Sequence, residues 1–216
     1  MTSAPSSAGE TSRFPQTPST GPLRGRELQP AAEGHGFTLW FTGLSGAGKT
    51  TIAEIVRPEL ERRGRKVEWL DGDEVREHLS RGLGFSKEDR DTNIERIGWV
   101  ASRLARHGAA VLVSAISPYA ETRRHARQLV EGFGPFVEVY VEASVEECAR
   151  RDVKGLYAKA FAGELKEFTG VSDPYEVPEK AEVVVHTEKE APEESARKVL
   201  EKLAELGLVE GVRAPV

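Results

Sequence analysis

The chain has very little cysteine: among its 216 residues, only Cys148 carries a thiol. A single cysteine excludes an internal disulfide and a cysteine-rich metal site. Cys148 lies in a stretch with helical spacing, beside Val145 and Ala149. We therefore expect a buried structural thiol there and not a nucleophile.

Long apolar runs and an excess of positive charge are also missing. The chain has no stretch of about 18 consecutive apolar residues, the length that a membrane-spanning helix needs. Its formal net charge of −5 gives no general basic field for a nucleic acid. We therefore expect a cytoplasmic protein that holds any anionic ligand with a local cluster of cations.

Residues 1–34 contain few large apolar side chains. Such a composition cannot bury enough surface to order the chain, and it has no continuous apolar core of the kind found in signal peptides. We predict a disordered tail here, followed by one domain over about residues 35–210, because the length is too short for two typical domains. The prolines scattered through the tail are Pro5, Pro15, Pro18, Pro22 and Pro30.

Apolar β-like runs alternate with helical patterns along the rest of the chain. This alternation predicts an α/β fold with three layers, in which a parallel sheet carries helices on both faces. Ser144 and Glu147 have the spacing of a capping box and mark the start of one helix. The expected strands are 37–42, 67–71, 110–115, 136–142 and 183–185, and the expected helices are about 49–63, 73–80, 90–107, 120–131, from 144 and 196–206.

The stretch that follows the first expected strand has the spacing of a phosphate-binding loop. Glycines let several backbone N–H groups approach a phosphate, and the helix behind them turns its positive end toward it. Lys49 would supply charge for the β- and γ-phosphates, and Thr50 a hydroxyl for Mg²⁺. The pattern predicts ATP or GTP binding on a P-loop NTPase-type sheet by Gly43, Leu44, Ser45, Gly46, Ala47, Gly48, Lys49 and Thr50.

Two carboxylates follow the second expected strand. Ligands of open parallel sheets lie at the carboxyl ends of the strands, and the run 111–114 supplies no carboxylate there. Asp71 and Asp73 are therefore expected near Mg²⁺ or the attacking hydroxyl. Asp73 would orient or deprotonate that hydroxyl, or hold the metal through water. The alternative is that Asp73 only caps the next helix.

Arg76, Arg90 and Asn93 are candidates for binding an anion. Arg90 and Asn93 share a helix face, and Arg76 lies one turn beyond Asp73, so their forked donors can surround one group. For each arginine alone, a solvated surface charge is the simpler interpretation. Phe85, in the polar loop between them, is either a hydrophobic anchor for the chain or a stacking platform for a base.

These residues fall within seven motifs that, in this order, resemble the adenylylsulfate kinase family. The resemblance spans about residues 35–208, and the motifs after the first separate this family from other small-molecule kinases. The motifs are Gly-Leu-Ser-Gly-Ala-Gly-Lys from Gly43, Asp-Gly-Asp-x-Val-Arg from Asp71, Leu-Gly-Phe-Ser from Leu83, Asp-Arg-x-x-Asn-Ile from Asp89, Ile-Ser-Pro-Tyr from Ile116, Lys-Gly-Leu-Tyr from Lys154 and Phe-Thr-Gly from Phe168.

The resemblance implies transfer of the ATP γ-phosphoryl group, with Mg²⁺, to the ribose 3′-hydroxyl of adenosine 5′-phosphosulfate (APS). The products would be 3′-phosphoadenosine 5′-phosphosulfate (PAPS) and ADP. Asp73 would act at the 3′-hydroxyl and Mg²⁺, while Phe85 and Phe168 would clasp the adenine. The other implied contacts are the phosphosulfate with Arg76, Arg90 and Asn93, the acceptor with Lys154 and Ile116, and the ATP adenine with Arg151, for which an ion pair at a helix end is the alternative.

Ser117 has two interpretations. The family's serine at this position is often described as a phosphorylated intermediate, which would make Ser117 a covalent carrier. No base is obvious beside it in the sequence, and Pro118 favours a residue that shapes the loop and lines the site. Direct in-line transfer needs no covalent step.

The segment 154–178 is rich in glycine, proline and lysine, and we predict that it forms a lid that keeps water from the phosphoryl group. An irregular surface excursion is the alternative. The sequence also departs from the common family pattern at Glu74, Thr92 and Val153, none of which is a proposed ligand.

Two other functions stay open on the sequence alone. One is a P-loop kinase of another hydroxyl substrate, such as a nucleoside or a sugar acid, which would not need an aromatic clasp. The other is a non-catalytic nucleotide-binding module, which would be expected to lack Lys49, Thr50 or Asp73; all three are present. Because dimers are the commonest assembly among small soluble enzymes, we expect a homodimer.

Overall fold

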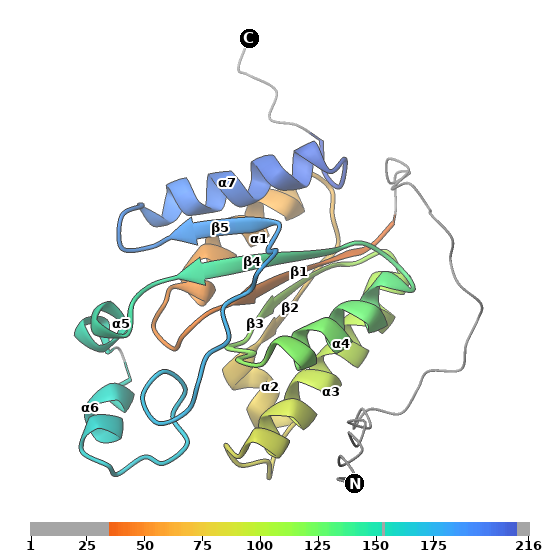
Figure 1. The fold of residues 1–216 in the computed structure, drawn as a ribbon. Coiled ribbons are helices and arrows are strands. Elements are labelled where there is room, and N and C mark those ends of the chain that lie inside the picture. The colour runs from red at the N-terminus through yellow and green to blue at the C-terminus, as the bar shows by residue number, and fades with distance from the viewer. Residues whose placement is uncertain (1–34, 153, 211–216) are drawn as a thin grey trace, which may run out of the picture.

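The sheet has five parallel strands. A computed structural model describes residues 35–152 and 154–210, so the predicted tail and Val153 lie outside the described residues. In the sheet the order is β2-β3-β1-β4-β5, and every neighbouring pair is parallel (Figure 1). The strands are β1 (Phe37–Thr42), β2 (Val67–Asp71), β3 (Ala110–Ser114), β4 (Phe136–Glu142) and β5 (Val183–His186).

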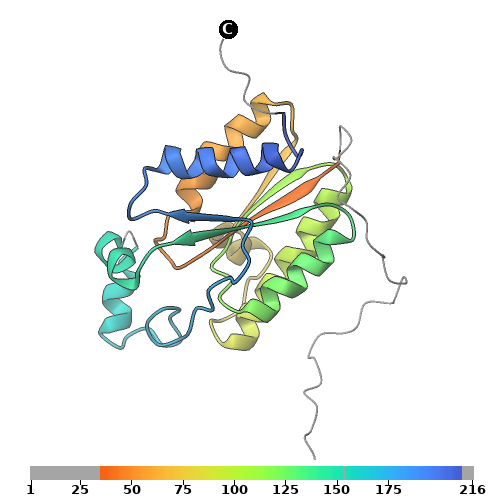
Figure 2. The same cartoon turned by 45° about the horizontal axis from the view of Figure 1, so that its top comes forward.

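Helices cover both faces of this sheet. α1 (Lys49–Arg62) packs beside α7 (Pro192–Glu205) on one face, and α3 (Lys87–Arg106) packs beside α4 (Ala120–Glu131) on the other (Figures 1 and 2). The short helices α2 (Gly72–His78), α5 (Val145–Arg151) and α6 (Leu156–Phe161) follow the carboxyl ends of strands or lie near them. The predicted three-layer α/β architecture is confirmed.

Two apolar cores hold the layers together, and β1 contributes to both because its side chains alternate between faces. Phe37, Leu39 and Phe41 are fully buried in the core under α1 and α7, whereas Trp40 is fully buried in the core under α3 and α4. Burying one such large side chain stabilises the fold by about 1.5–3 kcal/mol. The central strand is thereby held rigidly, which fixes the loop that follows it.

Some element boundaries differ from those expected. α3 begins three residues earlier than predicted, at Lys87, because the Ser86 hydroxyl caps it by accepting a hydrogen bond from Asp89 N. The helix α6 lies in the segment 154–178, for which the sequence pattern predicted no helix. Its first turn is held by Asp152, whose carboxylate accepts from Tyr157 N and Ala158 N. The predicted cap at Ser144 is confirmed by the bond from Glu147 N. Within the described residues, no helix has the length and apolarity to cross a membrane.

Candidate active site

One cavity opens at the carboxyl ends of β1, β2 and β3, with a volume of about 590 Å³. It collects residues from the phosphate-binding loop, the β2–α2 turn, α3, the loop after β3 and the segment 154–178. The predicted site residues that line it are Ser45, Gly46, Gly48, Lys49, Thr50, Asp73, Arg76, Phe85, Arg90, Asn93, Ile116, Ser117, Lys154 and Phe168. Gly43, Leu44, Ala47 and Arg151 do not line it.

The phosphate-binding loop has the backbone that its glycines predict. Gly43 has a φ of 151°, and a Cβ there would come within 2.4 Å of Val141 O on the neighbouring strand. Gly48 has a φ of 104° and forms the N-cap of α1, so the free N–H groups of the first helical turn face the cavity. This arrangement suits a phosphate group.

Lys49 is buried within this loop. Its Nζ donates hydrogen bonds to Gly43 O (2.9 Å) and Leu44 O (2.7 Å). Burial removes the ammonium from water and lowers the pKa of Lys49 to about 8, against the opposing attraction of Cys148 and the nearby carboxylates. An incoming phosphate would supply the counter-charge that this ammonium lacks.

Asp71, and not Asp73, caps α2. Asp71 Oδ1 accepts a bond from Asp73 N (3.0 Å), and its Oδ2 accepts one from the Thr50 hydroxyl (3.2 Å). Asp73 follows two residues later with its side chain largely exposed, so the alternative that Asp73 is the helix cap is wrong. The sequence pattern predicted both aspartates near Mg²⁺ or the attacking hydroxyl, and Asp71 is the one whose carboxylate contacts Thr50.

The Asp73 carboxylate instead forms an ion pair with Lys154, which lies between α5 and α6. Both side chains are more than half exposed, so the pair adds little to stability. Its importance is positional, because it connects the β2–α2 turn to the beginning of the segment 154–178. Both groups line the cavity.

Arg76 and Arg90 surround Phe85. The guanidinium of Arg76 lies 4.5 Å from the ring centroid and that of Arg90 lies 5.6 Å from it. Arg76 Nη1 donates to Gly84 O (2.9 Å), and Arg90 Nε donates to Phe85 O (2.7 Å). Burial lowers the pKa of both groups, yet guanidinium groups stay charged at neutral pH. The two arginines therefore fix the loop that presents Phe85 and also bring two positive charges to the cavity.

Two polar atoms in the cavity wall have no hydrogen-bond partner in the structure. They are Asn93 Oδ1 and Thr169 Oγ1, and both residues are buried. A buried acceptor without a partner costs free energy, so such atoms suit a ligand that donates to them. Asn93 was a predicted site residue, whereas Thr169 had no predicted role, although it lies in the Phe-Thr-Gly motif that begins at Phe168.

Phe168 reaches the cavity from the segment 154–178. Its ring meets that of Tyr157 edge to face, with centroids 5.0 Å apart, and the Tyr157 hydroxyl donates to Ser45 O in the phosphate-binding loop. Arg90 also donates to Glu167 O. The segment is thus connected both to the loop and to α3, and these contacts orient Phe168 toward the same cavity as Phe85.

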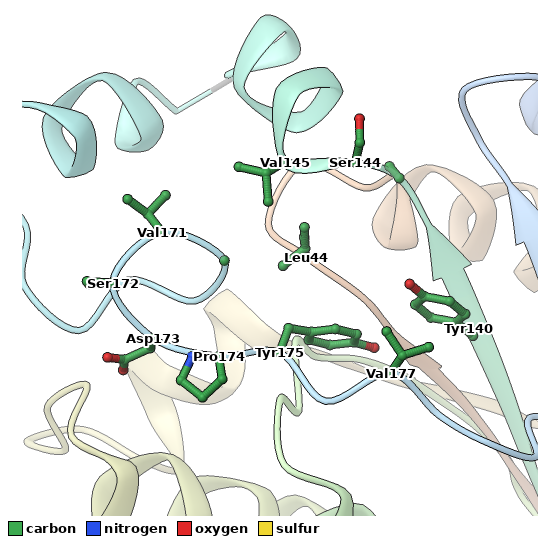
Figure 3. A pocket seen from close by; sticks show the side chains of 12 residues that line it. Leu44, Tyr140, Ser144, Val145, Val171, Ser172, Asp173, Pro174, Tyr175 and Val177 are labelled. Atoms are coloured by element: carbon green, nitrogen blue, oxygen red, sulfur yellow. The ribbon is translucent and has the colours of Figure 1, made fainter.

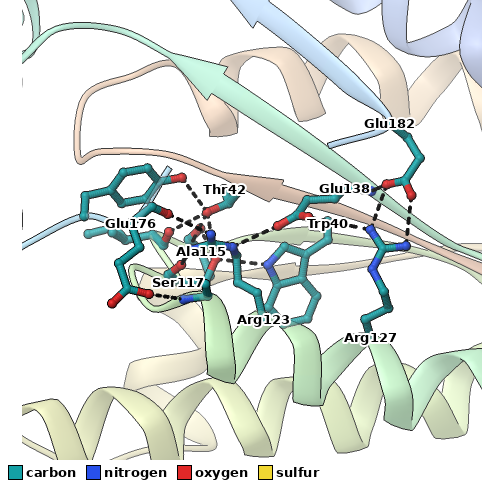
Figure 4. A network of polar contacts seen from close by, with 12 residues as sticks. Trp40, Thr42, Ala115, Ser117, Arg123, Arg127, Glu138, Glu176 and Glu182 are labelled. Carbon is teal, nitrogen blue, oxygen red and sulfur yellow. Dashed lines mark hydrogen bonds and ion pairs between the residues drawn. The ribbon is translucent and has the colours of Figure 1, made fainter. Parts of the chain in front are cut away.

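Ser117 is held tightly in the loop after β3 (Figure 4). It is 1% exposed and has a φ of 42°. Its Oγ accepts from Trp40 Nε1 (3.0 Å) and lies in hydrogen-bond contact with Thr42 Oγ1 (3.0 Å) and Ala115 O (3.3 Å). No carboxylate or imidazole of the described residues is among these partners.

Arg151, at the end of α5, supports the phosphate-binding loop through hydrogen bonds. It forms an ion pair with Glu147 within α5, and its Nη1 donates to Gly46 O (3.2 Å) and to the hydroxyl of Thr187 (3.1 Å). The predicted ion pair at a helix end is therefore present, together with contacts that the sequence pattern did not indicate. Thr187 itself donates to Ala47 O (2.8 Å).

A second hollow, of about 510 Å³, lies beside Leu44 between β4 and the segment 170–177 (Figure 3). Tyr140 and Tyr175 stack in it with their centroids 6.0 Å apart. None of the described residues that line it is basic, so it lacks the charge that a phosphorylated ligand needs. Of these two hollows, the first is therefore the one whose lining suits phosphoryl transfer.

That cavity places a phosphate-binding loop opposite a carboxylate and a cluster of arginines and aromatic rings. A phosphorylated donor and a flat anionic acceptor can therefore meet there with an ionised group between them. The described residues hold no cluster of three or more histidine, cysteine or acidic side chains that would bind a metal unaided.

Comparison with known proteins gives the same result. The profile of the family described as adenylylsulphate kinase matches residues 35–186. An adenylyl-sulfate kinase from Picosynechococcus sp. is 58% identical over 177 residues, which cover 82% of this chain and 98% of that protein.

Solved structures of relatives agree in fold. The structure of the Mycobacterium tuberculosis APS kinase CysC in complex with AMPPNP and APS has a TM-score of 0.75 and 43% identity, covering 78% of this chain and 98% of that chain. A hexameric APS kinase from Thiobacillus denitrificans has a TM-score of 0.63 and 40% identity, covering 81% of this chain and 30% of that chain. The chain described here belongs to the adenylylsulfate kinase family.

Proposed function

We propose that this protein transfers the γ-phosphoryl group of ATP to the 3′-hydroxyl of APS, giving PAPS and ADP. The observation that carries the proposal is one cavity in which Lys49 of the phosphate-binding loop, Asp73, and the cluster of Arg76, Arg90 and Phe85 meet. Family membership and the complex of the M. tuberculosis relative with AMPPNP and APS support the choice of substrates.

In this proposal each side of the cavity binds one substrate. The backbone N–H groups from Gly46 to Thr50 and the Lys49 ammonium bind the ATP phosphates. Phe85 and Phe168 hold the adenine of APS, since aromatic faces bind a flat base at low conformational cost. The guanidinium groups of Arg76 and Arg90 and the side-chain N–H of Asn93 hold the phosphosulfate, and Ile116 contacts the acceptor through its main chain.

Asp73 is the group that acts on the acceptor hydroxyl. Its exposed carboxylate can accept a hydrogen bond from the 3′-hydroxyl and direct one oxygen lone pair toward the γ-phosphorus. Lys154, its ion-pair partner, places a positive charge beside the transferring group. In a loose transition state this alignment and charge supply most of the rate enhancement.

Thr50 and the two aspartates fit a Mg²⁺ ion. The Thr50 hydroxyl and the Asp71 carboxylate are already in hydrogen-bond contact, and Asp73 lines the same wall. Mg²⁺ prefers few protein oxygens together with water and phosphate oxygens, so this small donor set suits it. When bound, the ion would neutralise charge on the β- and γ-phosphates.

Ser117 lines the site and takes no covalent role in this proposal. Its hydroxyl is buried and accepts the indole N–H of Trp40, and no described neighbour can remove its proton. The segment 154–178 acts as the lid, because it carries Lys154 and Phe168 over the cavity and can exclude water from the reaction.

The test measures ADP release from Mg-ATP with APS, AMP, adenosine and gluconate as separate acceptors, with the product identified by mass. We expect only APS to be consumed and to gain one phosphoryl group. Consumption of AMP, adenosine or gluconate in place of APS would support a P-loop kinase of another hydroxyl substrate, and no consumption of any acceptor would support a non-catalytic module.

Assembly and location stay predictions. We expect a homodimer, which sedimentation at several protein concentrations would test; a hexamer, as in the T. denitrificans relative, is the alternative outcome. We expect the enzyme in the cytoplasm, and fractionation of cells would check this.

A further inference from the structure

One arginine outside the cavity joins three parts of the chain. Arg123 lies in the first turns of α4 and is 4% exposed. Its Nη1 donates to Ser117 O (2.8 Å) and its Nη2 donates to Glu176 O (2.7 Å) (Figure 4). Its Nε lies 2.9 Å from Glu138 Oε1 on β4, an ion pair without the alignment of a hydrogen bond. All three sides of the guanidinium are thus engaged.

The first of these contacts holds the loop that lines the acceptor side of the cavity. Ser117 occupies the left-handed region of the backbone, which costs a non-glycine residue free energy and persists only where surrounding contacts enforce it. Trp40 and Thr42 fix its side chain, and Arg123 fixes its carbonyl. Arg123 therefore helps to keep the main chain of Ile116 and Ser117 at the cavity wall.

The second contact holds the end of the proposed lid. Glu176 N donates to Pro118 O (2.8 Å), and the Glu176 carboxylate accepts from Ala120 N (2.6 Å) at the start of α4. One residue earlier, the Tyr175 hydroxyl lies 2.9 Å from Thr42 Oγ1. Glu176 is thus bonded to the loop that Arg123 holds, and Tyr175 is bonded to Thr42, a side-chain partner of Ser117 in that loop. Arg123 donates to both Ser117 and Glu176.

We propose that Arg123 is a positioning residue that couples two segments. One is the loop after β3, residues 115–119, called the acceptor loop here, and the other is the end of the proposed lid at Glu176. The proposal rests on the proposed function, because the acceptor loop and the lid serve APS binding in it. It predicts that loss of the guanidinium fork weakens APS binding and lid closure together, while ATP binding on the other side of the cavity is unaffected.

The guanidinium geometry is what the coupling needs. A lysine at this position would keep the positive charge opposite Glu138, but its single nitrogen cannot reach two carbonyls and a carboxylate at fixed angles. The variant Arg123→Lys therefore separates the coupling from simple neutralisation of Glu138.

The chain offers a matched control one turn further along the same helix. Arg127 is also engaged in ion pairs, and its Nη1 and Nη2 each lie 2.9 Å from an oxygen of Glu182, but it contacts neither Ser117 nor Glu176. Arg127→Lys therefore makes the same chemical change in the same polar network but leaves the contacts with Ser117 and Glu176 intact.

The experiment measures kcat and the KM values for APS and ATP in full-length wild type, Arg123→Lys and Arg127→Lys, with thermal unfolding of each. We expect Arg123→Lys to raise the KM for APS about tenfold, because about that much affinity is lost with one charge-assisted hydrogen bond. The KM for ATP should stay within about twofold of the wild-type value. Arg127→Lys should lower the unfolding temperature but leave both KM values unchanged. Equal KM changes in the two variants, or an equal rise for both substrates, would overturn the proposal.

A second variant and a second readout keep the proposal testable if Arg123→Lys does not fold. Tyr175→Phe removes only the hydroxyl contact with Thr42 at the same junction, and we expect it to raise the KM for APS about threefold. An unchanged KM would refute the coupling.

Trypsin cleavage at the exposed Lys159 and Lys166 should be faster in Arg123→Lys and Tyr175→Phe than in Arg127→Lys, and equal cleavage would also count against the coupling. If wild type itself does not consume APS, the proposed function fails, whereas altered cleavage reports on the coupling alone.

Discussion

The two sides of the cavity are built in different ways. The proposed ATP side is made by one continuous stretch, Gly43 to Thr50, which runs from the end of β1 into the first turn of α1. The acceptor side is made by the β2–α2 turn, the Phe85 loop, α3, the loop after β3 and the segment 154–178, which are far apart in the sequence. Local backbone geometry decides the first, and tertiary contacts decide the second.

This difference determines what a substitution does on each side. On the proposed ATP side, backbone N–H groups of the phosphate-binding loop would make most of the contacts with the phosphates, and a substitution cannot remove them. Lys49 is the side chain on this side that would bring positive charge to the phosphates. On the acceptor side, each binding side chain depends on neighbours: Arg76 and Arg90 hold the Phe85 loop, and Tyr157 supports Phe168. Substitutions there should act mainly through acceptor binding.

The largest expected effect belongs to Lys49. Lys49→Ala removes the charge that faces the transferring phosphoryl group, and one such preorganised charge contributes roughly 3 kcal/mol to the transition state. We expect kcat to fall at least about a hundredfold, with the KM for APS little changed. The measurement is steady-state ADP release, with the exposed Lys66→Ala as the control. Near-normal turnover of Lys49→Ala would overturn the mechanism.

Phe168 tests the acceptor side with a smaller effect. Phe168→Ala removes one face of the adenine clasp and the edge-to-face contact with Tyr157, and aromatic pairs of this kind contribute about 0.5–1.5 kcal/mol. We expect the KM for APS to rise about tenfold and the KM for ATP to stay constant.

Phe161→Ala is the matched control for that prediction. Phe161 lies in the same segment and also packs on Tyr157, but it is 61% exposed and does not line the cavity. A rise in the KM for APS of the same size in both variants would mean that the segment, and not the Phe168 ring, is responsible.

The sequence predicted the backbone of the phosphate-binding loop almost completely, and it predicted in outline which other residues share the cavity. Glycine spacing around Lys49 is a local signal, because positive φ angles and a following helix need no distant partner. The pairing of Thr50 with Asp71 and the burial of the Thr169 hydroxyl depend on how β2 and the segment 154–178 pack, which no local pattern encodes. Without the resemblance to a family, Phe168 and Lys154 would have had no sequence signal that places them opposite Asp73.

The pH dependence of ATP binding should distinguish the two sides further. Burial lowers the pKa of Lys49 to about 8, so the free enzyme loses this positive charge as the pH rises through that value. We expect the affinity for Mg-ATP to fall about fourfold between pH 7 and pH 8.5, because the protonated fraction of Lys49 falls by about that factor over this range. Affinity for APS should change less over the same range, since the arginines of its site stay charged. Calorimetric titration of each ligand would measure both, and parallel curves would contradict the assignment of the slope to Lys49.

Ser117 should show the smallest effect on turnover and a clear effect on stability. Ser117→Ala leaves the buried indole N–H of Trp40 without its acceptor, which costs about 1–3 kcal/mol of folding free energy. If Ser117 only lines the site, kcat of the folded variant stays within about twofold of wild type, because direct transfer needs no hydroxyl there. A covalent carrier would instead lose turnover almost entirely, and a chiral γ-phosphoryl label would be transferred with retention of configuration. Inversion together with an active but less stable Ser117→Ala would place the role of this serine in the acceptor loop, where its contacts with Trp40, Thr42 and Arg123 already hold it.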